Sequence, residues 1–276
     1  MNLETLKTVV TTGRTIEPPR ILLYAVEGIG KSTFGANAYN PIFIQTEDGL
    51  NELPVSKFPQ VESFETLMDY LRLLMTETHE YKTLVIDTID WLEPIVWAYT
   101  CAVHGEPNIE GQEKKSKFGY AKGYHFAVDT WEKLITALDD LRLKKGMAIL
   151  LIGHSEIKRF DSPETESYDR YQPKLQRLAT ALLCEWCDAV LFANYVVRTE
   201  ETDVGFKKTV VRGKGGIDRS LYTQERPAFR AKNRYSLPPE LPFVKGQAWN
   251  ILMTEIKNNR VEQEEPNAGA KLHSQS

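Results

Sequence analysis

The segment that most constrains the fold is the glycine-rich stretch at residues 25–33, Ala-Val-Glu-Gly-Ile-Gly-Lys-Ser-Thr. It follows an apolar run at residues 21–24, and the residues at 34–38, Phe-Gly-Ala-Asn-Ala, can begin a helix. A strand, a glycine-rich turn and a helix in this order form one βα unit of an α/β fold. The competing interpretation is a strand-to-helix turn that binds no ligand.

The stretch nearly satisfies the phosphate-loop pattern, because Gly30, Lys31 and Ser32 are in place and only the first glycine is replaced, by Ala25. Gly28 and Gly30 let the loop turn its backbone N–H groups toward phosphate oxygens, and the start of the next helix adds partial positive charge. Lys31 would then reach the β- and γ-phosphates of ATP, and Ser32 would hold Mg²⁺. The residues predicted to bind these two cofactors are Glu27, Gly28, Ile29, Gly30, Lys31, Ser32 and Thr33.

Short apolar, β-rich runs alternate with stretches of helical periodicity along most of the chain. The runs lie at residues 21–26, 41–45, 83–87, 148–153 and 189–197. Their alternation with helices predicts an α/β fold with a mainly parallel central sheet flanked by helices.

The clearest helix is predicted at residues 129–145, where apolar residues repeat at three and four positions. From about residue 200 the pattern changes to short strand-like segments, and the glycines at 213–216 predict the tip of a C-terminal β-hairpin. We therefore expect one domain at residues 1–257 and a disordered tail at 258–276, where apolar residues are few.

An acidic residue, Asp87, ends the apolar run at 83–87. In a phosphate-loop protein this is the position that holds Mg²⁺ directly or through water. Asp90 is a nearby competitor for that role, and Asp87 could instead cap the helix that follows.

Two further polar residues follow predicted strands at the carboxyl edge of the sheet, where ligands of α/β proteins bind. Glu47 follows the second strand and is predicted to act as general base or to orient a water, although its neighbour Asp48 could do the same. His154 follows the fourth strand and could sense the γ-phosphate. The competing interpretations are turn residues for the two acids and a solvated side chain for the histidine.

Taken in order, these pieces resemble the RecA/Rad51-like recombinase core more than a nucleoside kinase or an AAA+ ATPase. The resemblance lies in Ile-Gln-Thr-Glu47 after the second strand and in Val-Ile-Asp87-Thr-Ile-Asp-Trp-Leu. His154 departs from the glutamine usual at its position. Lys232-Asn-Arg234 looks like the Lys-x-Arg finger of the DnaB-helicase and KaiC-like branch, which implies that Lys232 and Arg234 act on the nucleotide of a neighbouring subunit.

The compact size and the segment at 117–124 resemble phage-encoded nucleotide-binding proteins, including the RecA-like Sak group of single-strand annealing proteins. The resemblance implies an ATP hydrolase that binds single-stranded DNA and promotes annealing or strand pairing in phage recombination. Its expected partners are single-stranded DNA, further copies in a ring or filament, and a single-strand-binding protein. A replication or repair accessory ATPase and a small-molecule kinase are the alternatives, although a kinase should carry an arginine-rich lid.

The net charge of −4 is unevenly distributed, because two segments are basic. Residues 112–124 interleave lysines with aromatic rings, a combination typical of single-strand binding, whereas a solvated loop is the plainer interpretation. Residues 198–234 also carry an excess of Lys and Arg, with Arg219 expected beside the hairpin tip. The predicted nucleic-acid contacts are Lys114, Lys115, Lys117, Tyr120, Lys122, Tyr124, Arg212 and Lys214.

Three cysteines, no apolar run of membrane-spanning length and no signal-like N-terminus lead us to expect a cytoplasmic protein without a membrane partner.

Overall fold

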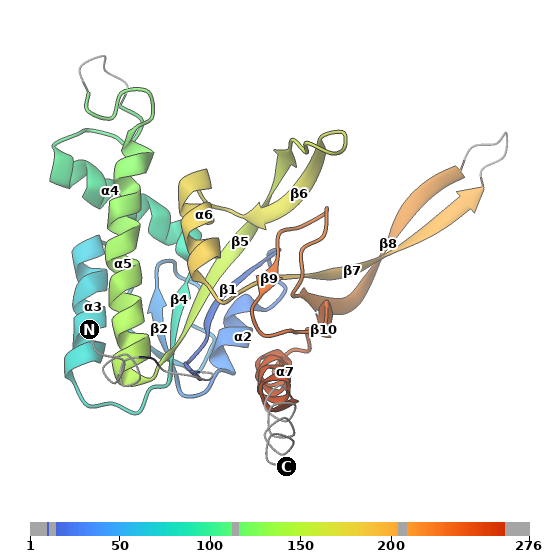
Figure 1. The fold of residues 1–276 in the computed structure, drawn as a ribbon, viewed down its shortest axis with the longest axis horizontal. Helices are drawn as coiled ribbons and strands as arrows, with labels where there is room; N and C mark the ends of the chain where they lie inside the picture. Colours follow the sequence, from blue (N-terminus) through green and yellow to red (C-terminus); the bar gives the residue numbers. More distant parts are fainter. Residues whose placement is uncertain (1–9, 11–14, 112–115, 204–208, 263–276) are drawn as a thin grey trace, which may run out of the picture.

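The computed structural model of the chain describes residues 10, 15–111, 116–203 and 209–262 (Figure 1). Within these residues the chain forms a ten-stranded sheet, in which eight strands follow the order β10-β8-β7-β1-β5-β4-β2-β3 and the other two, β6 and β9, pair with β5 and β7. The strands are β1 (Arg20–Ala25), β2 (Pro41–Gln45), β3 (Ser56–Lys57), β4 (Thr83–Asp87), β5 (Ala148–Phe160), β6 (Tyr168–Pro173), β7 (Ala189–Asp203), β8 (Thr209–Tyr222), β9 (Lys232–Asn233) and β10 (Glu240–Pro242).

Helices cover both faces of this sheet. Successive residues of a strand point to opposite faces, so an apolar strand such as β1 contributes to a core on each side. Leu22 and Tyr24 of β1 belong to the apolar core under α3, α4, α5 and α6. Ile21 and Leu23 of the same strand belong to a second core under α2 and α7 (Figure 1). The helices are α2 (Lys31–Ala36), α3 (Phe64–Thr76), α4 (Ile89–His104), α5 (Gly123–Lys145), α6 (Arg177–Trp186) and α7 (Ala248–Glu262).

The centre of the sheet is parallel. Strand β1 pairs in parallel with β5 and β7, and β4 pairs in parallel with β5 and β2. The carboxyl ends of these strands therefore meet at one edge. The long β7–β8 pair leaves the sheet as an antiparallel hairpin (Figure 1). The predicted fold class, a mainly parallel α/β sheet flanked by helices with C-terminal hairpins, is confirmed.

Predicted boundaries are most accurate where the sheet is buried on both faces. Strands β2 and β4 have the predicted bounds, and β1 is displaced by one residue. Strands β5 and β7 run further than predicted, because their outer, more polar halves leave the sheet and pair only with β6 and β8. The predicted tail boundary is wrong at its start: α7 continues to Glu262, and residues 263–276 lie outside the described residues.

None of the helices in the described residues combines the length and the apolar character required to cross a membrane.

Helix α4 contains a buried carboxyl group, that of Glu93, whose two oxygens both lie 3.0 Å from the backbone nitrogen of Gln176. Burial raises the pKa of Glu93 to about 7, although the hydrogen bond from Gln176 opposes this shift. The charge of Lys158 also lowers this pKa, whereas the charges of Glu156 and Asp90 raise it. The folded protein therefore keeps this proton to a higher pH than the unfolded chain does.

A pH-dependent stability difference follows for Glu93→Gln. The wild type should lose stability relative to the variant as pH rises from about 4.5 to about 7, by up to about 3 kcal/mol. Denaturant unfolding at pH 5 and pH 8 measures this difference, and Glu132→Gln, an exposed site on α5, is the matched control. Parallel pH profiles for the wild type and Glu93→Gln would contradict the shifted pKa.

Candidate nucleotide-binding site

A cavity of about 350 Å³ lies at the carboxyl edge of the sheet, between the ends of β1, β2, β4 and β5. It gathers residues that are far apart in the sequence. Its lining includes five of the seven predicted nucleotide-binding residues together with Glu47, Asp87 and His154. The other two lie at its margin: Glu27 is exposed, and the Ile29 side chain is buried in the core under α2.

The loop between β1 and α2 has the backbone conformation that its glycines allow. Gly28 has φ of +70° and Gly30 has φ of +108°, both in the left-handed half of the φ range that favours glycine. Helix α2 is only six residues long, so its dipole contributes less than the sequence suggested, and the loop amides are the main donors for an anion.

Lys31 is the first residue of α2, and only 7% of its surface is exposed. Its Nζ atom donates to the carbonyl oxygen of Val26 at 3.3 Å. Burial lowers the pKa of Lys31, whereas the carboxylates of Asp87 and Glu47 favour the charged form. The ammonium group thus has a weak backbone partner that a phosphate can replace.

The carboxylate of Asp87 lies at the end of β4 and accepts a hydrogen bond from the hydroxyl of Ser32. Burial raises the pKa of Asp87 to about 6, the charge of Glu47 adds to the rise, and Ser32 and Lys31 oppose it. Two oxygen donors from different elements meet here, and the buried acid lacks full charge compensation. This donor set fits Mg²⁺, which binds carboxylate and hydroxyl oxygens and keeps several waters.

Glu47 is placed against Asp87 by a link between the ends of β2 and β4. The hydroxyl of Thr46 donates to the carbonyl oxygen of Thr88 at 2.7 Å and accepts from its backbone nitrogen at 2.8 Å. The hydroxyl of Thr88 in turn donates to Glu47 Oε1 at 3.1 Å. Asp48 is exposed and accepts from Asn51 instead, so of the two acids only Glu47 lines the cavity.

His154 lines the cavity and is held there by Asp90. Its Nδ1 lies 2.9 Å from Asp90 Oδ2, and its backbone nitrogen donates to Asp90 Oδ1 at 3.0 Å. Burial by itself raises the pKa of Asp90, but the hydrogen bonds from His154 outweigh it and hold that pKa below its ordinary value. Asp90 is therefore the anion that orients His154, a role that sequence reasoning missed when it treated Asp90 as a competitor for Mg²⁺.

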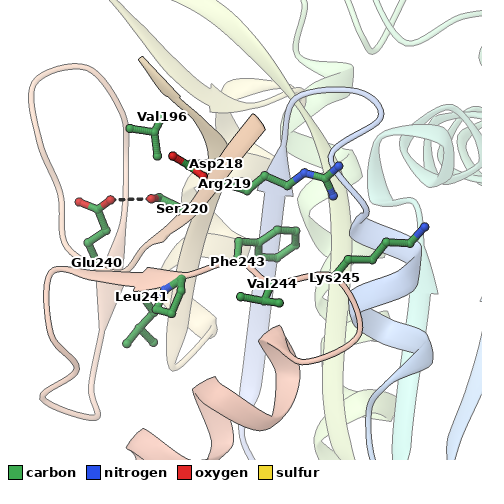
Figure 2. A pocket seen from close by; sticks show the side chains of 10 residues that line it. Val196, Asp218, Arg219, Ser220, Glu240, Leu241, Phe243, Val244 and Lys245 are labelled. Carbon is green, nitrogen blue, oxygen red and sulfur yellow. Dashed lines mark hydrogen bonds between the residues drawn. The ribbon is translucent and has the colours of Figure 1, made fainter. Parts of the chain in front are cut away.

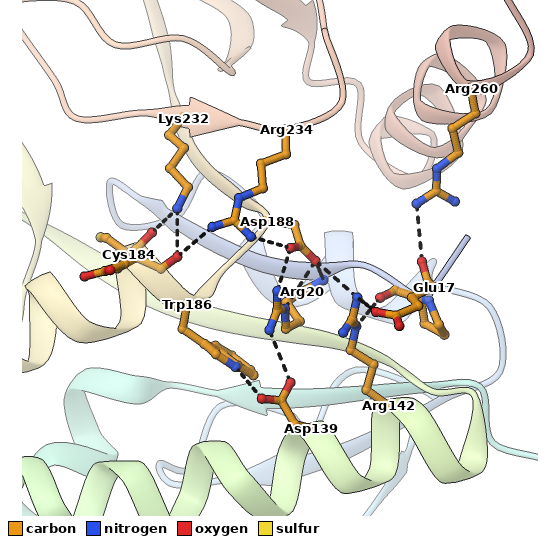
Figure 3. Close-up of polar contacts among 12 residues, drawn as sticks. Glu17, Arg20, Asp139, Arg142, Cys184, Trp186, Asp188, Lys232, Arg234 and Arg260 are labelled. Carbon is orange, nitrogen blue, oxygen red and sulfur yellow. Dashed lines mark hydrogen bonds and ion pairs between the residues drawn. The ribbon is translucent and has the colours of Figure 1, made fainter. Parts of the chain in front are cut away.

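The finger candidates do not line this cavity. Figure 3 shows Lys232 and Arg234 in a separate group of polar contacts around Asp188 and the end of α6. Lys232 is on β9, beside the start of β7, and its Nζ donates to the carbonyl oxygens of Cys184 and Glu185 at 2.6 and 3.0 Å. It therefore caps the last turn of α6. Arg234 pairs with the buried Asp188 at 3.2 Å, yet 53% of its side chain is exposed.

The first basic segment and the outer part of the second, the β7–β8 hairpin, lie at opposite ends of the molecule's long axis (Figure 1). In the first, Tyr120 is 99% exposed, and Lys117 and Lys122 are exposed too. Phe118 is buried and stacks on Phe126, and Tyr124 packs against a tryptophan. Two of the three aromatic rings of this segment therefore pack within the protein. Lys114 and Lys115 lie outside the described residues.

The outer part of the second basic segment is the β7–β8 hairpin. Arg212 pairs with Glu200, and Lys214 with Arg198, so the backbone of both is in strand β8. The expectation of a tip at 213–216 is wrong, because these residues lie within strand β8. Residues 204–208, between β7 and β8 in the sequence, lie outside the described residues. Arg219 is not near the tip either; it lies at the root of the hairpin.

A family model described as an AAA domain matches residues 17–235, a range that contains every residue lining the cavity. No curated protein matches the sequence. Among solved structures, the chain is similar to one titled "Crystal structure of the RadB recombinase", with a TM-score of 0.44 and 10% identity over 83% of this chain and 90% of that one.

Proposed function

Because the chain belongs to the family described as an AAA domain, we propose that it is a Mg²⁺-dependent ATP hydrolase that binds single-stranded DNA. We further propose that it promotes annealing or strand pairing in phage homologous recombination, the activity of the proteins that its motifs resemble. The observation that carries the ATPase is the single cavity in which Lys31, the Ser32–Asp87 pair and Glu47 meet.

Each cavity residue has a role in hydrolysis that its contacts support. Lys31 exchanges the Val26 carbonyl for the β- and γ-phosphates. Ser32 and Asp87 hold Mg²⁺, which when bound neutralises phosphate charge. Glu47, oriented by the Thr88 hydroxyl, positions the attacking water and accepts its proton.

His154 is the proposed link between the nucleotide and the β5–β6 hairpin. It lies on β5, where that strand passes the cavity and continues into the pairing with β6. Because Asp90 fixes Nδ1, the Nε2 atom is left for the γ-phosphate or the attacking water. A change at the nucleotide then reaches the outer strand directly along the chain.

For the DNA contact, we favour the β7–β8 hairpin over the lysine-rich segment before α5. Strand β7 pairs directly with β1, the strand that leads into the phosphate loop, so the root of this hairpin is joined to the strand before the loop. The exposed Lys117, Tyr120 and Lys122 form a separate contact at the far end of the molecule. Phosphate contacts by such residues weaken steeply with salt.

ATP hydrolysis measured with and without single-stranded DNA across a salt series tests the proposal. We expect ADP and inorganic phosphate as products, stimulation by single-stranded DNA, and loss of that stimulation as salt rises. Hydrolysis that responds only to a protein partner would support the accessory ATPase instead. A phosphorylated small molecule would identify a kinase.

We propose the finger role in trans for Arg234, whose side chain is 53% exposed, more than for Lys232, which caps α6. Arg234→Ala is expected to lower hydrolysis per subunit only at protein concentrations that support oligomers, because the finger serves a neighbour. Rates measured across a dilution series, with the oligomer followed by light scattering, test this expectation. An assembled Arg234→Ala protein with the wild-type rate would remove the finger.

A further inference from the structure

Arg219 connects the root of the β7–β8 hairpin to the outside of the phosphate loop. Its Nη1 atom donates to the carbonyl oxygen of Ile29 at 2.8 Å (Figure 2 shows its side chain reaching toward the loop). It lines a pocket formed with β10 and the segment before α7, not the nucleotide cavity itself. The guanidinium therefore contacts the loop without lining the cavity that would receive phosphate.

The position of this guanidinium is fixed by its surroundings. Arg219 is paired with Tyr195 across the hairpin, and its Cζ atom lies 5.6 Å from the centroid of the Tyr195 ring. Its backbone carbonyl accepts from the nitrogen of Phe243 at 3.0 Å. A planar cation supported by an aromatic face keeps its direction better than a free lysine would.

The contact determines which way one peptide group of the loop faces. The carbonyl of Ile29 and the N–H of Gly30 belong to the same trans peptide, in which the two bonds point in opposite directions. With the carbonyl held toward Arg219, the Gly30 N–H faces the other side of the loop, where Gly30 lines the nucleotide cavity.

Without a partner for that carbonyl, this peptide could turn easily. Gly30 has no side chain and has φ of +108°, so rotation of the peptide plane meets little steric resistance. A turned peptide would point a carbonyl oxygen at the phosphates and repel them. A cation on the carbonyl also polarises the peptide and makes its N–H a stronger donor.

We propose that Arg219 is a positioning residue of the nucleotide site, which holds the Ile29–Gly30 peptide so that its N–H faces the phosphates. The proposal rests on the proposed binding of ATP at this loop. It also means that Arg219 links the root of the basic hairpin to the phosphate loop by a hydrogen bond. A movement of the hairpin root would therefore reach the nucleotide directly.

The test uses the full chain and the variants Arg219→Gln and Arg219→Lys. We expect Arg219→Gln to bind ATP and ADP about tenfold more weakly, since a hydrogen bond to a charged group is lost, and Arg219→Lys to recover part of the affinity. Arg226→Gln is the matched control: Arg226 lies 5.4 Å from the Tyr222 ring centroid and pairs with Glu240 at 3.8 Å, on the side of the hairpin root away from the loop.

A spectroscopic readout separates positioning from general damage. The sequence contains two Ile-Gly pairs, Ile29-Gly30 and Ile152-Gly153, so labelling isoleucine carbonyls with ¹³C and glycine amides with ¹⁵N selects two amide signals. In nucleotide-free protein, Arg219→Gln should move the Gly30 signal upfield and leave the Gly153 signal in place, with an unchanged melting temperature.

The outcomes distinguish the proposal from its premise. Wild-type affinity in Arg219→Gln, or movement of both glycine signals together, would overturn the positioning role while leaving the ATPase intact. A wild-type protein that binds neither ATP nor ADP would overturn the proposed function and this role with it.

Discussion

Lys31→Ala should reduce ATP hydrolysis to background, a loss of at least about a thousandfold. Removing one positioned donor to a transition-state charge costs about 10²–10³ in rate, and Lys31 supplies both a donor and a full positive charge. In this site it is also the group that leaves the Val26 carbonyl to meet the phosphates. Nucleotide affinity and phosphate release, measured on the same preparation, report the two parts of the loss.

Two controls make the Lys31 result specific. Lys82→Ala removes an exposed lysine next to the opposite end of β4 and should leave the rate unchanged. A melting temperature close to that of the wild type excludes unfolding as the cause of the loss. Hydrolysis within a few fold of the wild type in Lys31→Ala would mean that the loop does not carry the chemistry.

The phosphate loop and its strand could be predicted from the sequence because their signal is local. Residues 25–33 are contiguous, the buried strands are unbroken apolar runs, and the helices between them have a strong periodicity. The order of the motifs resembled a RecA/Rad51-like core, and the matching family is described as an AAA domain. The match therefore confirms the P-loop nucleotide-binding class, while the phage-type annealing role stays a proposal.

The contacts that complete the site could not be predicted, because each joins residues distant in the sequence. Asp90 and His154 are 64 residues apart, and Arg219 meets Ile29 across 190 residues. Nothing in the local spacing distinguishes Asp90 as an anchor of His154 from Asp90 as a ligand. For Arg219, the neighbouring glycines suggested a turn, whereas the cross-strand pairing that places it at the hairpin root is a property of the register.

The aromatic residues before α5 illustrate a second limit. Phe118 and Tyr120 have the same sequence environment of lysines and glycines, yet Phe118 is fully buried and Tyr120 is almost fully exposed. Alternation of basic and aromatic residues is consistent with a binding surface and with a loop that uses every second ring as an anchor. Only the packing of Phe118 against Phe126 and His104 decides between the two for that ring.

Asp87→Asn is the second substitution with a large expected effect, and it should lower the hydrolysis rate without lowering the melting temperature. Hydrolysis supported by Mg²⁺ should fall about a hundredfold or more, because an amide oxygen replaces the charged ligand beside Ser32. In metal-free protein the melting temperature should stay the same or rise, since the substitution removes a carboxylate whose burial is unfavourable. Asp48→Asn, an exposed acid next to the cavity, is the matched control and should change neither. An Asp87→Asn protein that is less stable and equally active would make Asp87 a structural residue, and the magnesium role would then pass to another acid of the cavity.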